Sequence, residues 1–166
     1  MAQDIRIITT GGTFDKQYDA IKGELTFRES QLPKILLQSR CTLSVTLEGP
    51  LAVDSLYMSE QQRKEIADAV KTSAENRVVV VHGTDTMVKT ATVTASVLGP
   101  DDRHVVVFTG AMIPYSLEFS DAVFNLGCAI TAAQLLTPGV YVAMSGKIFP
   151  YDHVVKNKAK GVFEPV

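Results

Sequence analysis

Positive charge is not in excess in this sequence, because 18 Asp and Glu outnumber 16 Lys and Arg and leave a formal net charge of −2. Attraction to phosphate backbones regardless of base sequence requires a dense basic surface. The charge balance therefore argues against nucleic acid as the principal ligand. A small molecule becomes the expected partner.

Long apolar runs are also missing. No stretch approaches the roughly 20 apolar residues that cross a membrane. Residues 1–10 carry only Arg6 as a basic residue, and their short apolar run soon reaches Gly11, so they lack the core of a secretory signal peptide. We therefore expect a cytoplasmic protein with no membrane partner.

Cysteine and histidine are scarce and scattered. Cys41 and Cys128 match no paired-ligand spacing and lie in apolar surroundings, where a free cysteine behaves as a small buried hydrophobe. His82, His104 and His153 have no nearby cysteine or HxxxH partner. We expect no metal site.

The 166 residues, 46% of them hydrophobic, suffice for one domain with an ordinary core, and no repeat or long linker divides them. Short apolar runs rich in β-branched residues recur along the chain. They predict strands at residues 5–9, 43–47, 78–81, 105–108 and 140–144. Nearly continuous runs such as VVVV at 78–81 are typical of parallel strands covered on both faces.

Helical patterns alternate with these strands. Ser59 and Gln62 form a capping-box pattern ahead of an apolar face that continues from Ile66. Further helices are predicted at 31–38, 86–98 and 121–136, the second despite its β-branched residues, because it lies between two strong strands. The alternation predicts an α/β fold with a mostly parallel open sheet flanked by helices. Residues 18–27 read as a hairpin that could act as a lid.

The first polar turn, TTGGTF at residues 9–14, directly follows the opening strand. Ligands of open α/β sheets bind beyond the carboxyl ends of the strands. Two glycines let the backbone turn sharply and approach a ligand, presenting Thr13 and an N–H group that could hold an oxyanion. The structural alternative is a tight strand-to-loop turn.

The second polar turn, HGTDTM at residues 82–87, follows the strand at 78–81. Asp85 could bind a substrate ammonium, and Thr84 offers a hydroxyl near a helix N-terminus. Alternatively, either side chain caps the following helix.

Together these hexapeptides resemble the L-asparaginase family of bacterial-type amidohydrolases, whose signatures centre on TGGT and HGTDT. The resemblance continues in the same order through most of the chain. It includes Asp54-Ser55 and Met58, FTGAM at 108–112, FNL at 124–126, and VKN at 155–157.

The resemblance implies a catalytic role for five residues. Thr13 would be the nucleophile and Tyr18, on the hairpin, the partner that orients it. Thr84, Asp85 and Lys156 would form a second cluster beside the scissile amide. A threonine hydroxyl needs a neighbour that accepts its proton, and ammonia must be protonated to leave, which a Tyr or a desolvated Lys can provide.

The same resemblance implies a substrate-binding set, with Ser55 as the binder of the substrate α-carboxylate. The set comprises Gly12, Asp54, Ser55, Gly83, Thr84 and Asp85. Simpler alternatives stay open: Tyr18 only packs the hairpin, Ser55 only closes a turn, and Lys156 is a solvated charge beside Lys158 and Lys160.

The sequence departs from the family at Phe14 and Asp15 after TGGT, and at Leu56 beside the binding serine. Family members also carry a smaller C-terminal domain. We expect residues 1–166 to form a single domain of the asparaginase N-terminal type, with that C-terminal domain absent.

The function implied by the resemblance is hydrolysis of L-asparagine to L-aspartate and ammonia, without metal or organic cofactor, by a homo-oligomer. One alternative is an ammonia-supplying module of a tRNA-dependent amidotransferase. Another is a non-catalytic amino-acid sensor, although binding alone does not require two hydroxyl nucleophiles.

Overall fold

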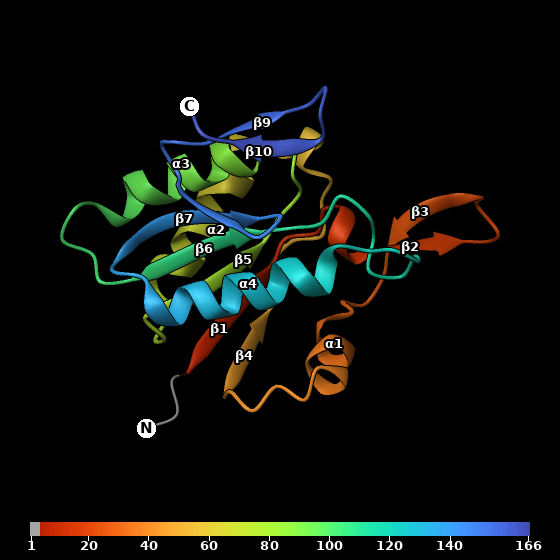
Figure 1. Ribbon diagram of the computed structural model, residues 1–166, viewed down its shortest axis with the longest axis horizontal. Helices are drawn as coiled ribbons and strands as arrows, with labels where there is room; N and C mark the ends of the chain where they lie inside the picture. Colours follow the sequence, from red (N-terminus) through yellow and green to blue (C-terminus); the bar gives the residue numbers. More distant parts are fainter. Residues whose placement is uncertain (1–3) are drawn as a thin grey trace.

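The computed structural model describes residues 4–166, so residues 1–3 of the N-terminal segment considered above lie outside the described residues. A six-stranded sheet with the order β4-β1-β5-β6-β7-β8 forms the centre (Figure 1). Its strands are β1 (Ile5–Thr9), β4 (Val45–Glu48), β5 (Arg77–Val81), β6 (Val105–Thr109), β7 (Gly139–Met144) and β8 (Lys147–Pro150). All neighbours pair in parallel except β8, which runs antiparallel to β7. The predicted α/β class is confirmed.

Helices cover both faces of this sheet (Figure 1). They are α1 (Leu32–Gln38), α2 (Glu60–Lys71), α3 (Met87–Leu98) and α4 (Ala122–Leu135). Because successive strand residues point to opposite faces, Val79 and Val81 pack with α1 and α4, whereas Val78 and Val80 pack with α2 and α3. Burial on both faces explains why the central strands read as continuous valine runs.

Local sequence signals agree with the helix positions. The predicted capping box is present at the start of α2, where Ser59 and Gln62 bond each other's backbone. The helix α3 forms despite its β-branched residues because it packs Met87 and Ala91 into the core, and the hydroxyl of the buried Thr94 is satisfied by the Thr90 carbonyl at 2.9 Å.

Two small hairpins lie outside the central sheet. The first pairs β2 (Lys16–Asp19) with β3 (Glu24–Phe27) and projects away from the sheet (Figure 1). It confirms the predicted hairpin, which begins two residues earlier than expected. The second pairs β9 (Val155–Asn157) with β10 (Val162–Glu164). Within residues 4–166, no helix has the length and apolar character needed to cross a membrane.

Candidate active site

The loops that follow β1, β4 and β5 meet at the carboxyl edge of the sheet. The turn after β1 joins the loop after β4 through a bridge in which Gly12 N donates to Val53 O at 3.1 Å and Val53 N donates to Thr10 O at 3.0 Å. The Thr10 hydroxyl also donates to Val81 O, the last residue of β5, at 2.8 Å. Hydrogen bonds from the backbone and from the Thr10 side chain therefore fix the turn after β1 relative to the loop after β4 and the end of β5.

Glycine is required where these loops touch. A Cβ built at Gly12 would lie 2.5 Å from the backbone nitrogen of Gly83, and Gly12 has a φ of +75°. A Cβ at Gly83 would lie 2.5 Å from Ser55 Oγ. The two predicted substrate-binding glycines, Gly12 and Gly83, thus lie against each other, and the buried Ser55 lies beside Gly83.

The second predicted cluster is formed by residues that lie far apart in the sequence. Lys156 of β9 donates from Nζ to Thr84 Oγ1 at 2.7 Å and to Asp85 Oδ1 at 2.8 Å. Its side chain is only 11% exposed, so it is not the solvated charge of the structural alternative. Neither Thr84 nor Asp85 caps α3, whose N-cap residue is Thr86. The arrangement places a desolvated ammonium beside a threonine hydroxyl.

Thr13 and Tyr18 are less closely placed. Thr13 begins the 3-10 turn η1 (Thr13–Asp15) and is half-buried. Tyr18 in β2 is 60% exposed and forms no hydrogen bond to Thr13 within residues 4–166. The structure therefore brings together the glycines, Ser55 and the Lys156 cluster, but not these two hydroxyls.

Asp54 has a partner that the sequence did not indicate. Its Oδ2 accepts a hydrogen bond of 2.7 Å from Lys16 Nζ, and its Oδ1 accepts one of 3.0 Å from Leu56 N. The hydrogen bond from Lys16, followed by that from the Leu56 N–H, lowers the pKa of Asp54 against the opposing effect of burial. Asp54 thus joins the base of the β2–β3 hairpin to the turn that carries Ser55.

The two departures after TGGT have structural explanations. Phe14 is fully buried in the core beneath the turn. The Asp15 carboxylate, 4% exposed, accepts hydrogen bonds from Ser30 Oγ at 2.8 Å and Gln31 N at 2.9 Å. Burial raises the pKa of Asp15, while the two hydrogen bonds oppose this rise. Both residues anchor the turn that carries Thr13.

The second turn begins with a buried histidine. His82 is fully buried, with Nδ1 2.8 Å from Gly83 O and Nε2 2.8 Å from Thr90 Oγ1. Burial lowers the pKa of His82 from 6.5 to about 4, and the nearby Arg63 charge adds to the effect. His82 and Arg63 carried no functional prediction from the sequence, although His82 lies within the HGTDTM motif.

This depressed pKa predicts that the free energy of unfolding falls on mild acidification. Below pH 6.5 the unfolded chain binds a proton at His82, whereas the folded chain does so only near pH 4, so stability is lost as pH falls through this window. The loss over the whole window is roughly 3 kcal/mol. Urea unfolding at several pH values measures it.

His82→Asn is the control, because an asparagine does not titrate and should flatten the slope. The interval from pH 6.5 to 5 is the most informative. Hydrogen bonds from Thr46 and other groups lower the pKa of Glu75 to about 2, so Glu75 changes the free energy of unfolding at lower pH. Equal slopes in wild type and variant would contradict the assignment.

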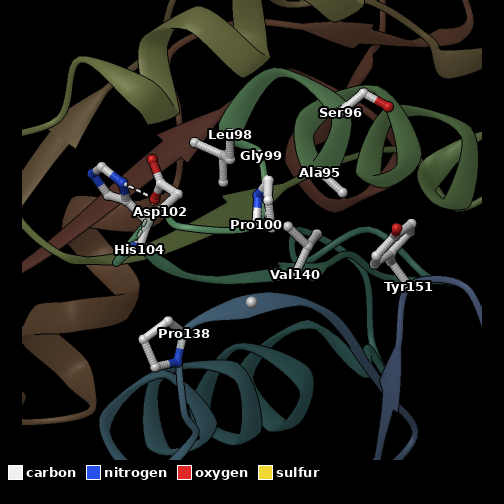
Figure 2. Close-up of a pocket in the computed structure, with 11 residues that line it drawn as sticks. Ala95, Ser96, Leu98, Gly99, Pro100, Asp102, His104, Pro138, Val140 and Tyr151 are labelled. Carbon is white, nitrogen blue, oxygen red and sulfur yellow. Dashed lines mark hydrogen bonds and ion pairs between the residues drawn. The ribbon is translucent and has the colours of Figure 1, made fainter.

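A separate hollow of the described surface lies away from these turns. A cavity of about 600 Å³ lies beside the amino ends of β6 and β7, at the edge opposite the glycine turns (Figure 2). Pro100 and Pro138 flank it, and Asp102 accepts a hydrogen bond of 2.6 Å from His104 within its wall. None of the motif residues lines this cavity, so we place the candidate active site at the convergent turns.

Comparisons with known proteins identify the family of this chain and its fold. Residues 4–163 match the family described as Asparaginase, N-terminal. The chain superposes on the thermostable L-asparaginase from Thermococcus kodakarensis with a TM-score of 0.87 and 26% identity, covering 98% of this chain and 51% of that one.

Curated relatives point in two directions. The glutaminase-asparaginase of Acinetobacter glutaminasificans is 28% identical over 92% of this chain and 49% of its own length. A glutamyl-tRNA(Gln) amidotransferase subunit from Methanococcus vannielii is 29% identical over 96% of this chain and 38% of its own length. The chain thus spans less than half the length of each of these two relatives.

Proposed function

Because the chain belongs to the asparaginase family, whose N-terminal domain matches residues 4–163, we propose that it hydrolyses the side-chain amide of L-asparagine to L-aspartate and ammonia. The observation that carries this proposal is the bond of Lys156 Nζ to both Thr84 Oγ1 and Asp85 Oδ1, beside the turn that presents Thr13. A shielded ammonium on a threonine hydroxyl is suited to proton transfer at a leaving group.

In the first step, Thr13 Oγ attacks the amide carbon and the carbonyl oxygen becomes an oxyanion. Gly12 N–H is already bonded to Val53 O, whereas the backbone N–H groups of Thr13 and Asp85 bond no acceptor within residues 4–166. These two free groups are the proposed oxyanion donors. Tyr18 is the proposed relay for the Thr13 proton: its hydroxyl accepts this proton and passes its own to solvent, which requires the β2–β3 hairpin to close over the turn.

In the second step, the carbon–nitrogen bond breaks as the nitrogen takes a proton through the Thr84 hydroxyl, which Lys156 reprotonates. Ammonia leaves, and an ester links Thr13 to the aspartyl group. Water then attacks the ester carbon and passes a proton through Thr84 to Lys156. As the ester bond breaks, Thr13 regains its proton through Tyr18 and L-aspartate is released.

Substrate orientation is assigned to the remaining predicted residues. Asp85 Oδ1 pairs with Lys156, and its side chain, 32% exposed, can also receive the substrate α-ammonium. Ser55, placed against Gly83, is proposed to bind the α-carboxylate. Gly12 and Gly83 are proposed to form the floor of the site, and Asp54 to fix the Ser55 turn through Lys16.

A second candidate function is ammonia supply within an amidotransferase. The match to an amidotransferase component at 29% identity favours it as much as the match to a glutaminase-asparaginase at 28% favours free hydrolysis. Ammonia supply would require a partner chain that consumes the ammonia.

The homo-oligomeric state and the cytoplasmic location also stay predictions. Sedimentation velocity of the purified chain tests the oligomeric state.

Ammonia release by the purified chain separates these candidates. We expect turnover of L-asparagine without any partner, and a lower kcat/KM for L-glutamine, whose longer side chain displaces the amide from the Lys156 cluster. Glutamine turnover that appears only with an amidotransferase partner and tRNA would instead support ammonia supply. Calorimetric binding of asparagine with no ammonia release would support the sensor alternative.

A further inference from the structure

A buried arginine lies behind both binding turns. Arg63 of α2 is 2% exposed, and its guanidinium donates to neutral oxygens: from Nη1 to Thr90 Oγ1 at 2.6 Å and to Thr86 Oγ1 at 3.0 Å, and from Nη2 to Met58 O at 3.2 Å. The nearby carboxylate of Glu60 is largely exposed and lies 3.5 Å from Nε, which has no hydrogen bond. Burying a cation with so little compensation is costly, which suggests a role other than stability.

One route from the guanidinium leads to the Gly83 carbonyl. An arginine only donates, so Thr90 Oγ1 accepts its hydrogen bond. The single Thr90 proton then goes to His82 Nε2, 2.8 Å away, rather than to the weaker acceptor Met58 Sδ at 3.8 Å. His82 Nε2 is then an acceptor, and the ring proton lies on Nδ1. That proton matches the Gly83 carbonyl at 2.8 Å, which can only accept. Each hydrogen bond of the route therefore has its donor on the side nearer Arg63 and its acceptor on the side nearer the Gly83 carbonyl.

The route determines how the next peptide faces the site. No described peptide bond is cis, so the Gly83 carbonyl and the Thr84 N–H point in opposite directions. With the carbonyl held towards the buried His82 ring, the Thr84 N–H points away from it. Thr84 also carries the hydroxyl bonded to Lys156.

A second route leads to the other turn. Thr86 Oγ1 accepts from Arg63 and donates to the Ser55 carbonyl at 2.9 Å. Arg63 Nη2 bonds the carbonyl of Met58, just beyond the 3-10 turn η2 (Ser55–Tyr57). One side chain is therefore connected to the turns that carry Ser55 and Thr84.

We infer that Arg63 is a positioning residue. It fixes the direction of the hydrogen bonds through Thr90 and His82, and thereby holds the Gly83–Thr84 peptide in a fixed position relative to Ser55. The inference deepens the proposed function and rests on it. Arg63 itself touches no reacting atom. Its effect passes through the two turns.

The test combines kinetics with the protonation state of His82. Arg63→Met removes the donors while keeping a long apolar side chain, and should lower kcat for L-asparagine on the order of 10²-fold, because small displacements of catalytic groups have effects of this size. His82→Leu should cause a similar loss. His82→Asn should stay within about 10-fold of wild type, because its amide nitrogen occupies the position of Nδ1.

Arg77→Met is the matched control, because this partly buried arginine also has a buried Nε without a partner but lies at the opposite end of β5. It should lower the melting temperature without lowering kcat. An Arg63→Met variant that loses melting temperature but keeps kcat would overturn the inference. If Arg63→Met does not fold, Thr90→Val, which cuts the same route, takes its place.

Nuclear magnetic resonance of protein with ¹⁵N-labelled histidine provides the readout independent of catalysis. At pH 7 the His82 proton should lie on Nδ1 in wild type. Arg63→Met frees Thr90 Oγ1 to accept from His82 and should raise the share of the Nε2-protonated form. A proton on Nε2 in wild type would overturn the inference. Absence of asparaginase activity with the expected Nδ1 proton would instead reject the proposed function alone.

Discussion

Replacing Thr13 with alanine is expected to lower kcat for L-asparagine by about 10³-fold or more while leaving the circular dichroism spectrum unchanged. The reason is that Thr13 supplies the oxygen that forms the bond to the amide carbon. Its hydroxyl has no hydrogen-bond partner within residues 4–166, and the turn is held by backbone bonds of Gly12 and Val53. Removing the hydroxyl should therefore spare the fold.

Thr13→Ser is the matched control, because it keeps a hydroxyl at the same position. We expect it to retain far more activity than the alanine variant. Steady-state ammonia release and rapid-quench mass spectrometry for an aspartyl ester measure the two effects. A Thr13→Ala variant that keeps a tenth of the wild-type kcat would exclude Thr13 as the nucleophile.

Replacing Lys156 with methionine is expected to lower kcat by about 10²- to 10⁴-fold, the usual contribution of a general acid or base, with a much smaller change in KM. Lys156 Nζ lies 2.7 Å from Thr84 Oγ1, so its loss removes the source of the proton for the departing ammonia. The change affects a transition-state interaction rather than ground-state binding.

Lys160→Met controls for loss of charge on the same hairpin, because Lys160 is 68% exposed and its ammonium pairs, within residues 4–166, only with Glu164 at 3.6 Å. It should leave kcat and KM near wild type. A KM effect alone in Lys156→Met would assign Lys156 to substrate binding through Asp85. Unchanged kinetics would return it to a structural role.

The central sheet could be predicted because both of its faces are buried. Residues 78–81 and 105–108 are continuous apolar runs rich in valine, and the structure buries all of them. The edge strand β4 was predicted at 43–47 but spans Val45–Glu48, because at an edge the sequence pattern is mixed and burial constrains it less. The strands β8, β9 and β10 were missed because they are short and partly polar.

The parts of the candidate site that lie within one sequence motif could be predicted. TGGT and HGTDT identified Gly12 and Gly83, but only the structure shows that these glycines touch. Lys156 could be connected to Thr84 only through the family resemblance, since Lys156 and Thr84 lie 72 positions apart in the sequence.

Partners far apart in the sequence left no signal of their own. Lys16 bonds Asp54 across 38 positions, and Arg63 bonds Thr90 across 27. Neither pair belongs to a spacing pattern of one helix or strand, so no periodicity indicates it. Such contacts follow from how the loops are packed at the sheet edge, which single-sequence patterns do not encode.

The most direct measurement is the fate of L-asparagine labelled with ¹³C at the side-chain amide carbon, followed by nuclear magnetic resonance with the purified wild-type chain. We expect the amide signal to be replaced by the side-chain carboxylate signal of L-aspartate, with one ammonia released per molecule and no such conversion by Thr13→Ala. A persistent amide signal, under conditions where calorimetry shows that asparagine fills the site, would contradict the proposed hydrolysis.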